Sequence, residues 1–105
     1  MKKYVLDSTG NVPIECNDVI QWGLMFSNQD RKVDATTIGD SSVSTVFLGL
    51  DHNWGEGEPV LWETLVFDSP FDGLMDRCSG TREDAQQMHN NMVEKIMLGK
   101  RSIKI

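Results

Sequence analysis

The chain has 105 residues, 39% hydrophobic and 25% charged, which fits one globular domain spanning residues 1–105. No apolar run approaches the ~20 residues of a membrane-spanning helix, and the opening MKKYVLDSTG lacks the apolar stretch of a signal peptide. The net charge is −6 and no basic cluster precedes the C-terminal tail, which argues against nucleic-acid binding. We therefore expect a cytoplasmic protein with no membrane partner.

The first residues predict a β-hairpin followed by a short helix. In KYVLDSTGNVPIEC, apolar residues alternate on both sides of the turn DSTGN, and Pro13 favours a sheet edge because it lacks an amide donor. In NDVIQWGLMFSNQD, Asn17 or Asp18 is a suitable helix cap. Val19, Trp22 and Phe26 fall at helical spacing, and we expect Trp22 and Phe26 to be core anchors. The following SNQDRKVDATTIGDSS predicts a long polar connection, with room for a short strand around 32–37.

The clearest strands are SVSTVFLGL and PVLWETLVF, which loop 51–59 joins into an antiparallel hairpin. If the hairpin folds symmetrically about Gly55, Trp62 shares a face with Val46 and Leu48, whereas Glu63 shares the other face with Phe47 and Leu65. Both faces would be apolar, and an antiparallel sheet that is wet on one side should alternate polar with apolar residues. We therefore expect both faces to be covered, by helices or by a second subunit.

The C-terminal part predicts a turn-rich link, SPFDGLMDRCSG, with a brief third strand or a disordered tip, and then the clearest helix of the chain. Thr81 and Asp84 have the spacing of a capping box, and Gly99 is a plausible stop. The apolar stripe of this helix consists of Ala85, Met88, Met92 and Ile96. The predicted fold class is α+β, a small antiparallel sheet made of the N-terminal and central hairpins and packed with two helices.

Two polar residues interrupt apolar patterns. Glu63 stands between Leu61 and Leu65, and His89 lies in the stripe of the last helix. Burying an unpaired polar group costs several kcal/mol, so we expect these residues to meet each other, or to meet Asp51 or His52. Two interpretations remain open: a structural hydrogen bond that ties the helix to the sheet, or an acid–base pair in a polar pocket. The catalytic candidates are Asp51, His52, Glu63 and His89.

The loop DHNWGEGEP offers a second kind of site. Its candidate oxygen ligands, Asp51, Asn53, Glu56 and Glu58, suit calcium. However, the sixth and twelfth positions counted from Asp51 hold Glu56 and Trp62, where an EF-hand loop needs Gly and Glu. Cys16, Cys78 and the two histidines show no zinc-ligand spacing, so we expect free thiols, no metal and no cofactor. Trp54 either folds back onto the sheet or is presented to a partner, and the binding candidates are Trp54, Glu56 and Glu58.

Charge is segregated along the chain, since no Lys or Arg lies between Lys32 and Arg77. This interval contains Asp34, Asp40, Asp51, Glu56, Glu58, Glu63, Asp68, Asp72 and Asp76. The end of the chain reverses the sign with Lys95, Lys100, Arg101 and Lys104. The pattern indicates either an acidic face for a cation or a basic partner, or a solvated surface followed by a basic helix end that suits the helix dipole.

The phrase VSTVFLGLDHNWGEGEPVLWETLVF, followed by TREDAQQMH, resembles a family of small proteins encoded by bacteriophages and prophages. The likeness extends to YVLDSTGN and DVIQWGLMF, so it covers most of the chain, although the tail from Lys100 does not match and SPFDGLMDRCSG is longer than the link expected. The matching positions are Asp51, His52, Glu63, Thr64, Ala85 and His89. The resemblance implies a phage accessory protein that works inside a bacterial cell. It implies no particular activity.

Three functions follow as hypotheses. The first is a phage accessory protein that acts by protein–protein interaction, as a homodimer or as the binder of a host or phage protein. The second is a small enzyme or ligand-binding module, for which Asp51, His52, Glu63 and His89 must converge within about 4–6 Å. The third is an acidic mimic of nucleic acid that inhibits a nucleic-acid-binding protein.

Overall fold

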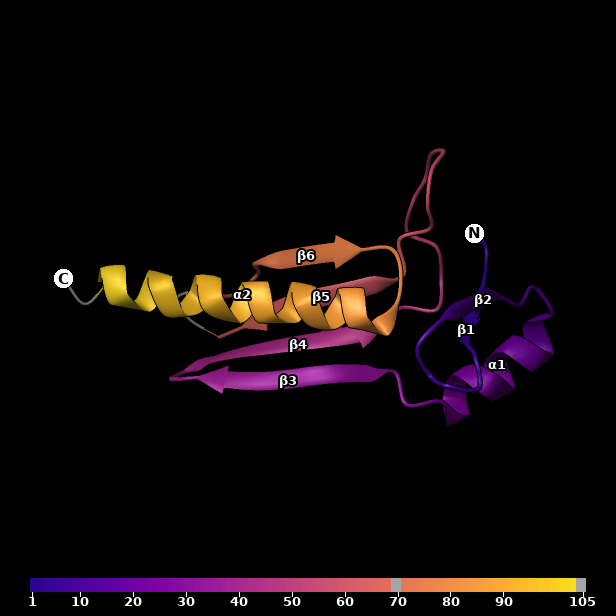
Figure 1. The fold of residues 1–105 in the computed structure, drawn as a ribbon, viewed down its shortest axis with the longest axis horizontal. Helices are drawn as coiled ribbons and strands as arrows, with labels where there is room; N and C mark the ends of the chain where they lie inside the picture. The colour runs from indigo at the N-terminus through magenta and orange to yellow at the C-terminus, as the bar shows by residue number, and fades with distance from the viewer. Residues whose placement is uncertain (69–70, 104–105) are drawn as a thin grey trace.

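The computed structural model describes residues 1–68 and 71–103, with side chains as far as Gly99. It confirms the α+β class: a two-stranded antiparallel sheet, a four-stranded antiparallel sheet and two helices (Figure 1). The elements are β1 (Tyr4–Leu6), β2 (Pro13–Glu15), α1 (Val19–Asn28), β3 (Lys32–Ile38), β4 (Ser41–Phe47), β5 (Trp62–Phe67), β6 (Met75–Cys78) and α2 (Arg82–Ile103).

The larger sheet has the strand order β3-β4-β5-β6, so each strand pairs with its neighbour in sequence. The short strand considered around 32–37 within the polar connection is the edge strand β3, and the brief third strand considered after the central hairpin is β6. The polar composition of β3 suits this position, because only part of an edge strand faces the core. Within β3 the side chains of Asp34 and Thr36 turn toward α2, where both contact the His89 imidazole.

The register of the central hairpin differs from the symmetric one by one residue. Val43 lies opposite Val66 and Phe47 lies opposite Trp62, and all four side chains are buried on the same face. The expected sharing of faces, with Trp62 opposite in orientation to Phe47, is therefore wrong. The cause lies near 49–51, which leave the hairpin and bond to the N-terminal segment: Tyr4 N donates to Gly49 O at 2.8 Å and Asp51 N to Lys2 O at 3.0 Å.

Helix α2 covers one face of the four-stranded sheet along its length (Figure 1). The predicted stripe is confirmed, since Ala85, Met88, Met92 and Ile96 are all buried. Thr81 and Asp84 form the predicted capping box, with Thr81 N donating to Asp84 Oδ2 at 2.9 Å and Asp84 N to Thr81 Oγ1 at 3.4 Å. Gly99 does not end the helix, which continues to Ile103 while the Phe71 ring packs against the bare Gly99 backbone.

The opposite face of the sheet is not covered by any helix or strand within residues 1–68 and 71–103. We call it the open face. From the pairing and the alternation of side chains, its residues are Lys32, Ala35, Thr37, Ser42, Ser44, Val46, Glu63, Leu65, Phe67, Met75 and Arg77. Of the two alternatives for covering both faces, coverage by helices of the same chain is therefore wrong, and coverage by a second subunit stays a prediction.

Helix α1 packs against β1 rather than against the larger sheet. It begins after Asp18, whose side chain accepts a hydrogen bond from Gln21 N at 3.0 Å. The Trp22 Nε1 donates to Tyr4 O at 3.0 Å and to Gly49 O at 3.2 Å, and its ring stacks on Phe26 at 4.8 Å between centroids. Trp22 and Phe26 thus anchor the helix as predicted, whereas Val19 is 63% exposed and is not part of the core.

Candidate functional site

The loop between β4 and β5 extends away from the end of the larger sheet (Figure 1). Two side chains brace it from within. The Asp51 Oδ1 accepts hydrogen bonds from Asn53 N at 2.8 Å and from Val60 N at 3.0 Å, which closes the base of the loop. The Asn53 Nδ2 donates to Glu58 O at 3.0 Å and to Glu56 O at 3.3 Å, which ties the outgoing half of the loop to its returning half. Asx side chains stabilise turns in this way, so the loop has a defined shape.

Trp54 lies at the tip of this braced loop, and 82% of its surface is exposed. The side chain is therefore presented to solvent and does not fold back onto the sheet. Glu56 and Glu58, which follow on the same loop, are also exposed. Since Asp51 and Asn53 hold the backbone, the exposed Trp54 is presented by an ordered segment together with two acidic neighbours.

The oxygen atoms of the loop do not gather around a cation. Within the described part of the chain, no three residues of the types His, Cys, Asp and Glu are placed to hold a metal ion. Asp51 and Asn53, the first two candidate ligands, direct their side-chain oxygens to backbone amides. The chemistry of this loop is therefore that of an aromatic side chain with an acidic surround.

Glu63, the first of the candidate catalytic residues, lies on the open face of the sheet. Its Oε2 accepts a hydrogen bond from Arg77 Nε at 2.9 Å, and the side chain keeps 19% of its surface exposed. Arg77 is the cross-strand partner of Glu63 on β6. A cross-strand ion pair explains how a carboxylate is accommodated between Leu61 and Leu65.

His89 lies on the covered side of the sheet, where only 1% of the residue is exposed. Its Nδ1 is 2.7 Å from Thr45 Oγ1 and its Nε2 is 2.8 Å from Thr36 Oγ1. The Asp34 carboxylate is 3.6 Å from the same Nε2. Burial lowers the pKa of His89 below its usual value, and the negative charge of Asp34 partly opposes this. The ring is therefore neutral at pH 7.

The imidazole is part of a chain of hydroxyl groups across three strands. Thr45 Oγ1 also lies 2.5 Å from Thr64 Oγ1, so the network joins α2 to β3, β4 and β5. It separates two apolar clusters, one around Phe47 and Trp62 and the other around Val43 and Ile96. The His89 environment thus matches the structural interpretation, a hydrogen-bonded tie between helix and sheet.

The four candidate catalytic residues do not converge, so the expected meeting of Glu63 and His89 is wrong. The two side chains point to opposite faces of the sheet because Glu63 and Thr64 are successive residues of β5 and only Thr64 faces His89. The Asp51 Oδ1 accepts a hydrogen bond from Val60 N at the base of the loop, and the His52 Nδ1 lies 2.7 Å from Leu50 O. No acid–base pair is formed among these four residues.

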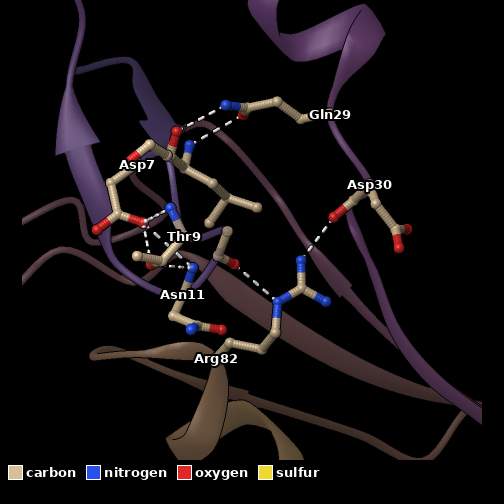
Figure 2. A pocket seen from close by; sticks show the side chains of 9 residues that line it. Asp7, Thr9, Asn11, Gln29, Asp30 and Arg82 are labelled. Atoms are coloured by element: carbon tan, nitrogen blue, oxygen red, sulfur yellow. Dashed lines mark hydrogen bonds between the residues drawn. The ribbon is translucent and has the colours of Figure 1, made fainter.

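A concave region that the sequence did not indicate lies where the β1–β2 turn, the α1–β3 link and the start of α2 meet (Figure 2). It measures about 530 Å³. Arg82 lines it, and its guanidinium donates to three backbone oxygens: Gly10 O at 2.8 Å, Lys32 O at 3.1 Å and Asp30 O at 2.5 Å. These carbonyls satisfy the guanidinium, so this is a joint between segments. The only signal in the sequence was an Arg at the first turn of a helix.

Asp7 and Gln29, two further polar residues of this joint, are also engaged with the protein. The Asp7 Oδ1 accepts from Thr9 Oγ1 at 2.5 Å and from Thr9 N at 3.1 Å, and these bonds lower the pKa of Asp7. Gln29 bonds both backbone groups of Leu6 with its amide, at 2.9 and 2.6 Å (Figure 2). The side chain of Gln29 thereby acts as a short extra strand beside β1.

Cys16 and Cys78 are free thiols, as expected. Burial raises the pKa of Cys78 to about 11, with a smaller contribution from the negative charge of Asp84. This thiol is protonated at neutral pH, and since the thiolate is the nucleophilic form, Cys78 has the character of a packing residue.

Helix α1 carries a second exposed apolar surface. Val19, Ile20 and Leu24 are 63%, 76% and 63% exposed, and no residue of the helix is fully buried. The helix has no charged residue between Val19 and Asn28. Exposed apolar residues that lie together indicate a contact surface.

Comparison of the chain with models of protein families, with curated proteins and with solved structures found no match. Over the described residues, no helix is both long and apolar enough to span a membrane.

Proposed function

We propose that the chain is a phage-encoded accessory protein that acts in the bacterial cytoplasm by binding another protein through Trp54 and the braced loop around it. The observation that carries this proposal is the 82% exposure of Trp54 on a loop whose backbone is held by Asp51 and Asn53. Trp is among the residues most often found at the energetic centre of protein interfaces. A loop that is already ordered loses little conformational entropy when it binds.

The chemistry of the loop indicates the kind of partner surface. Trp54 requires an apolar pocket, and Glu56 and Glu58 favour a rim of Lys or Arg residues around it. The acidic interval between Lys32 and Arg77 extends the same negative potential beyond the loop. We therefore expect association to become slower as salt is added, because screening weakens the attraction between the acidic loop and a basic rim.

Affinity capture from lysates of bacterial cells tests the proposal. The tagged full chain is compared with Trp54→Ala and with Met75→Ala, in which an exposed apolar side chain is removed from β6 at a distance from the loop. We expect a defined bacterial or phage protein on the wild-type chain and on Met75→Ala, and its loss on Trp54→Ala. Equal capture by the wild type and Trp54→Ala would contradict the proposal.

A further inference from the structure

We infer that the hollow between the braced loop and the N-terminal segment receives the side chain of an Arg residue from the partner protein. The inference rests on the proposed function, since it names a side chain of the partner that this loop recognises. It adds a binding site within the chain itself to the exposed part of Trp54, which enters a pocket of the partner.

The hollow lies where the N-terminal segment runs beside the loop, because Asp51 N donates a hydrogen bond to Lys2 O at 3.0 Å (Figure 1). It measures about 550 Å³, which leaves ample room for one long side chain. Two aromatic residues line it, Tyr4 and Trp54, and Pro59 lines it as well. Aromatic rings attract a cation that lies against their faces.

Two carboxylates line the same hollow, those of Asp51 and Glu56. Asp51 is held in place because its Oδ1 accepts from Asn53 N and Val60 N, and both bonds leave Oδ2 able to accept from a ligand. Glu56 is exposed, and Asn53 holds its backbone carbonyl rather than its side chain. Carboxylates and aromatic rings around one hollow are the partners that a guanidinium prefers.

The charges near Tyr4 give the hollow a negative potential. Among the described residues that line it, Lys2 is the one basic side chain, and its Nζ lies 3.8 Å from Glu15 Oε1 on β2. Burial raises the pKa of Tyr4, and the charges of Glu15 and Asp51 raise it further, whereas Lys2 opposes them with a smaller effect than that of Glu15. The phenol therefore lies in a net negative potential, which favours a cationic ligand.

An Arg side chain uses both kinds of wall at once. Its flat guanidinium can lie against an aromatic ring while its N–H groups donate to the carboxylates. The ammonium of Lys is more strongly hydrated and has no flat face, so it gains less from the rings. An apolar side chain would remove water from two carboxylates without giving them a partner. The hollow therefore favours Arg over both.

Titration of the isotope-labelled full chain with Nα-acetyl-arginine amide, followed by nuclear magnetic resonance, tests the inference without any partner protein. The neutral probe Nα-acetyl-citrulline amide has nearly the same shape and lacks the charge. All samples are kept at one ionic strength, because salt weakens the attraction. The reporting signals are the indole N–H of Trp54 and the amides of Gly55 and Gly57, which also line the hollow.

Three variants identify the groups that bind the probe. Glu56→Gln removes one charge from the hollow and preserves the backbone bond from Asn53. Glu94→Gln makes the same change at an exposed position of α2 outside the hollow and is the matched control. Trp54→Ala removes a ring that is 82% exposed, so the fold should persist, and circular dichroism monitors this for each variant.

We expect saturable shifts of the reporting signals, with a dissociation constant of about 1–10 mM for the arginine probe. The citrulline probe should bind about fivefold more weakly or less. Glu56→Gln and Trp54→Ala should each weaken binding of the arginine probe about threefold or more, and Glu94→Gln should leave it unchanged. Shifts that do not saturate, equal binding of the two probes, or equal effects of Glu56→Gln and Glu94→Gln would overturn the inference.

Failure of this inference can be told apart from failure of the proposed function. If Trp54→Ala loses the captured protein but the arginine probe does not bind, the proposed function stands and the inference is overturned. If capture does not depend on Trp54, the proposed function is overturned, and the assignment of the Arg residue to that partner falls with it even when the probe binds.

Discussion

The His89 imidazole lies with its Nδ1 2.7 Å from Thr45 Oγ1, in a site where both residues are almost fully buried. This bond, together with the bond from Nε2 to Thr36 Oγ1, fixes the position of α2 along the sheet. An apolar stripe alone would tolerate a slide of the helix, whereas two directional bonds to one ring do not. The buried imidazole therefore defines a single packing arrangement.

Removal of the Thr45 hydroxyl tests this tie. Thr45→Val keeps the shape of the side chain but leaves His89 Nδ1 and Thr64 Oγ1 without their shared partner. We expect a loss of about 1–3 kcal/mol in the free energy of unfolding, measured by urea denaturation. Thr37→Val, an exposed β3 residue on the open face, is the matched control and should change the value by less than about 0.5 kcal/mol. Equal losses for the two variants would show that the network adds no stability.

The same imidazole predicts how stability depends on pH. Burial lowers the pKa of His89 in the folded chain, so below about pH 6.5 the unfolded chain binds a proton that the folded chain does not. Stability should be complete above this value and should fall as the pH is lowered toward 5, by up to about 1.4 kcal/mol per pH unit. Asp7 and Asp34, whose pKa values are lowered by hydrogen bonds, contribute only at lower pH, near and below their usual value of 3.8.

His89→Gln checks the assignment of this pH effect. The variant should be less stable at pH 7, because an amide cannot reproduce both bonds of the ring, but its stability should change much less between pH 7 and 5. Urea denaturation at several pH values measures both quantities. An unchanged slope in His89→Gln would assign the effect to other groups.

Much of this architecture could be predicted from sequence patterns, and the errors have identifiable causes. The period of Ala85, Met88, Met92 and Ile96 revealed the covered side of α2, and turn residues revealed the first hairpin. The register of the central hairpin could not be predicted, because it depends on a tertiary pairing of Gly49 and Asp51 with residues Tyr4 and Lys2. Strand periodicity is local and does not report this contact.

In the candidate site, too, local patterns could be predicted and tertiary partners could not. The pattern break at His89 correctly identified a buried polar residue that needs a partner, but Thr36 and Thr45 were its partners, and hydroxyl groups on a strand give no special signal. The break at Glu63 has a different cause, the cross-strand Arg77 on a strand that begins after a turn-rich link. The exposure of Trp54 was one of two alternatives, and the strand and turn patterns of the sequence do not distinguish them.

Gly49 links the two sheets at a point with no room for a side chain. Its φ is +73°, and a Cβ atom at this position would overlap Cε2 of the Phe26 ring. Gly49→Ala should therefore cost about 2–4 kcal/mol, from backbone strain and from displacement of α1. Gly73→Ala has a similar φ of +89° but open space around the new methyl group, and should cost about 1 kcal/mol. Thermal unfolding of both variants separates steric from conformational effects.

Substitution of Arg82 should lower the stability of the joint between the first hairpin, the α1–β3 link and α2. Arg82→Lys keeps the charge but cannot reach three carbonyls in different directions. We expect about 1–3 kcal/mol lower stability and faster hydrogen exchange of the amides in β1 and β2, since the hairpin loses its bond from Arg82 to Gly10 O. Exchange that is faster throughout the chain, without a bias toward these strands, would contradict the role of a local joint.

Trp54 is the residue that we expect at the centre of the contact with the protein partner. A photoreactive amino acid placed at position 56 of the full chain, on the same loop as an intact Trp54, and for comparison at position 75 on β6, tests this contact directly in bacterial cells. We predict a discrete crosslinked protein after irradiation of the position 56 variant, its loss when Trp54→Ala is added, and a much weaker yield from position 75. The absence of any crosslinked protein at position 56, or a yield that neither position 75 nor Trp54→Ala lowers, would contradict the account.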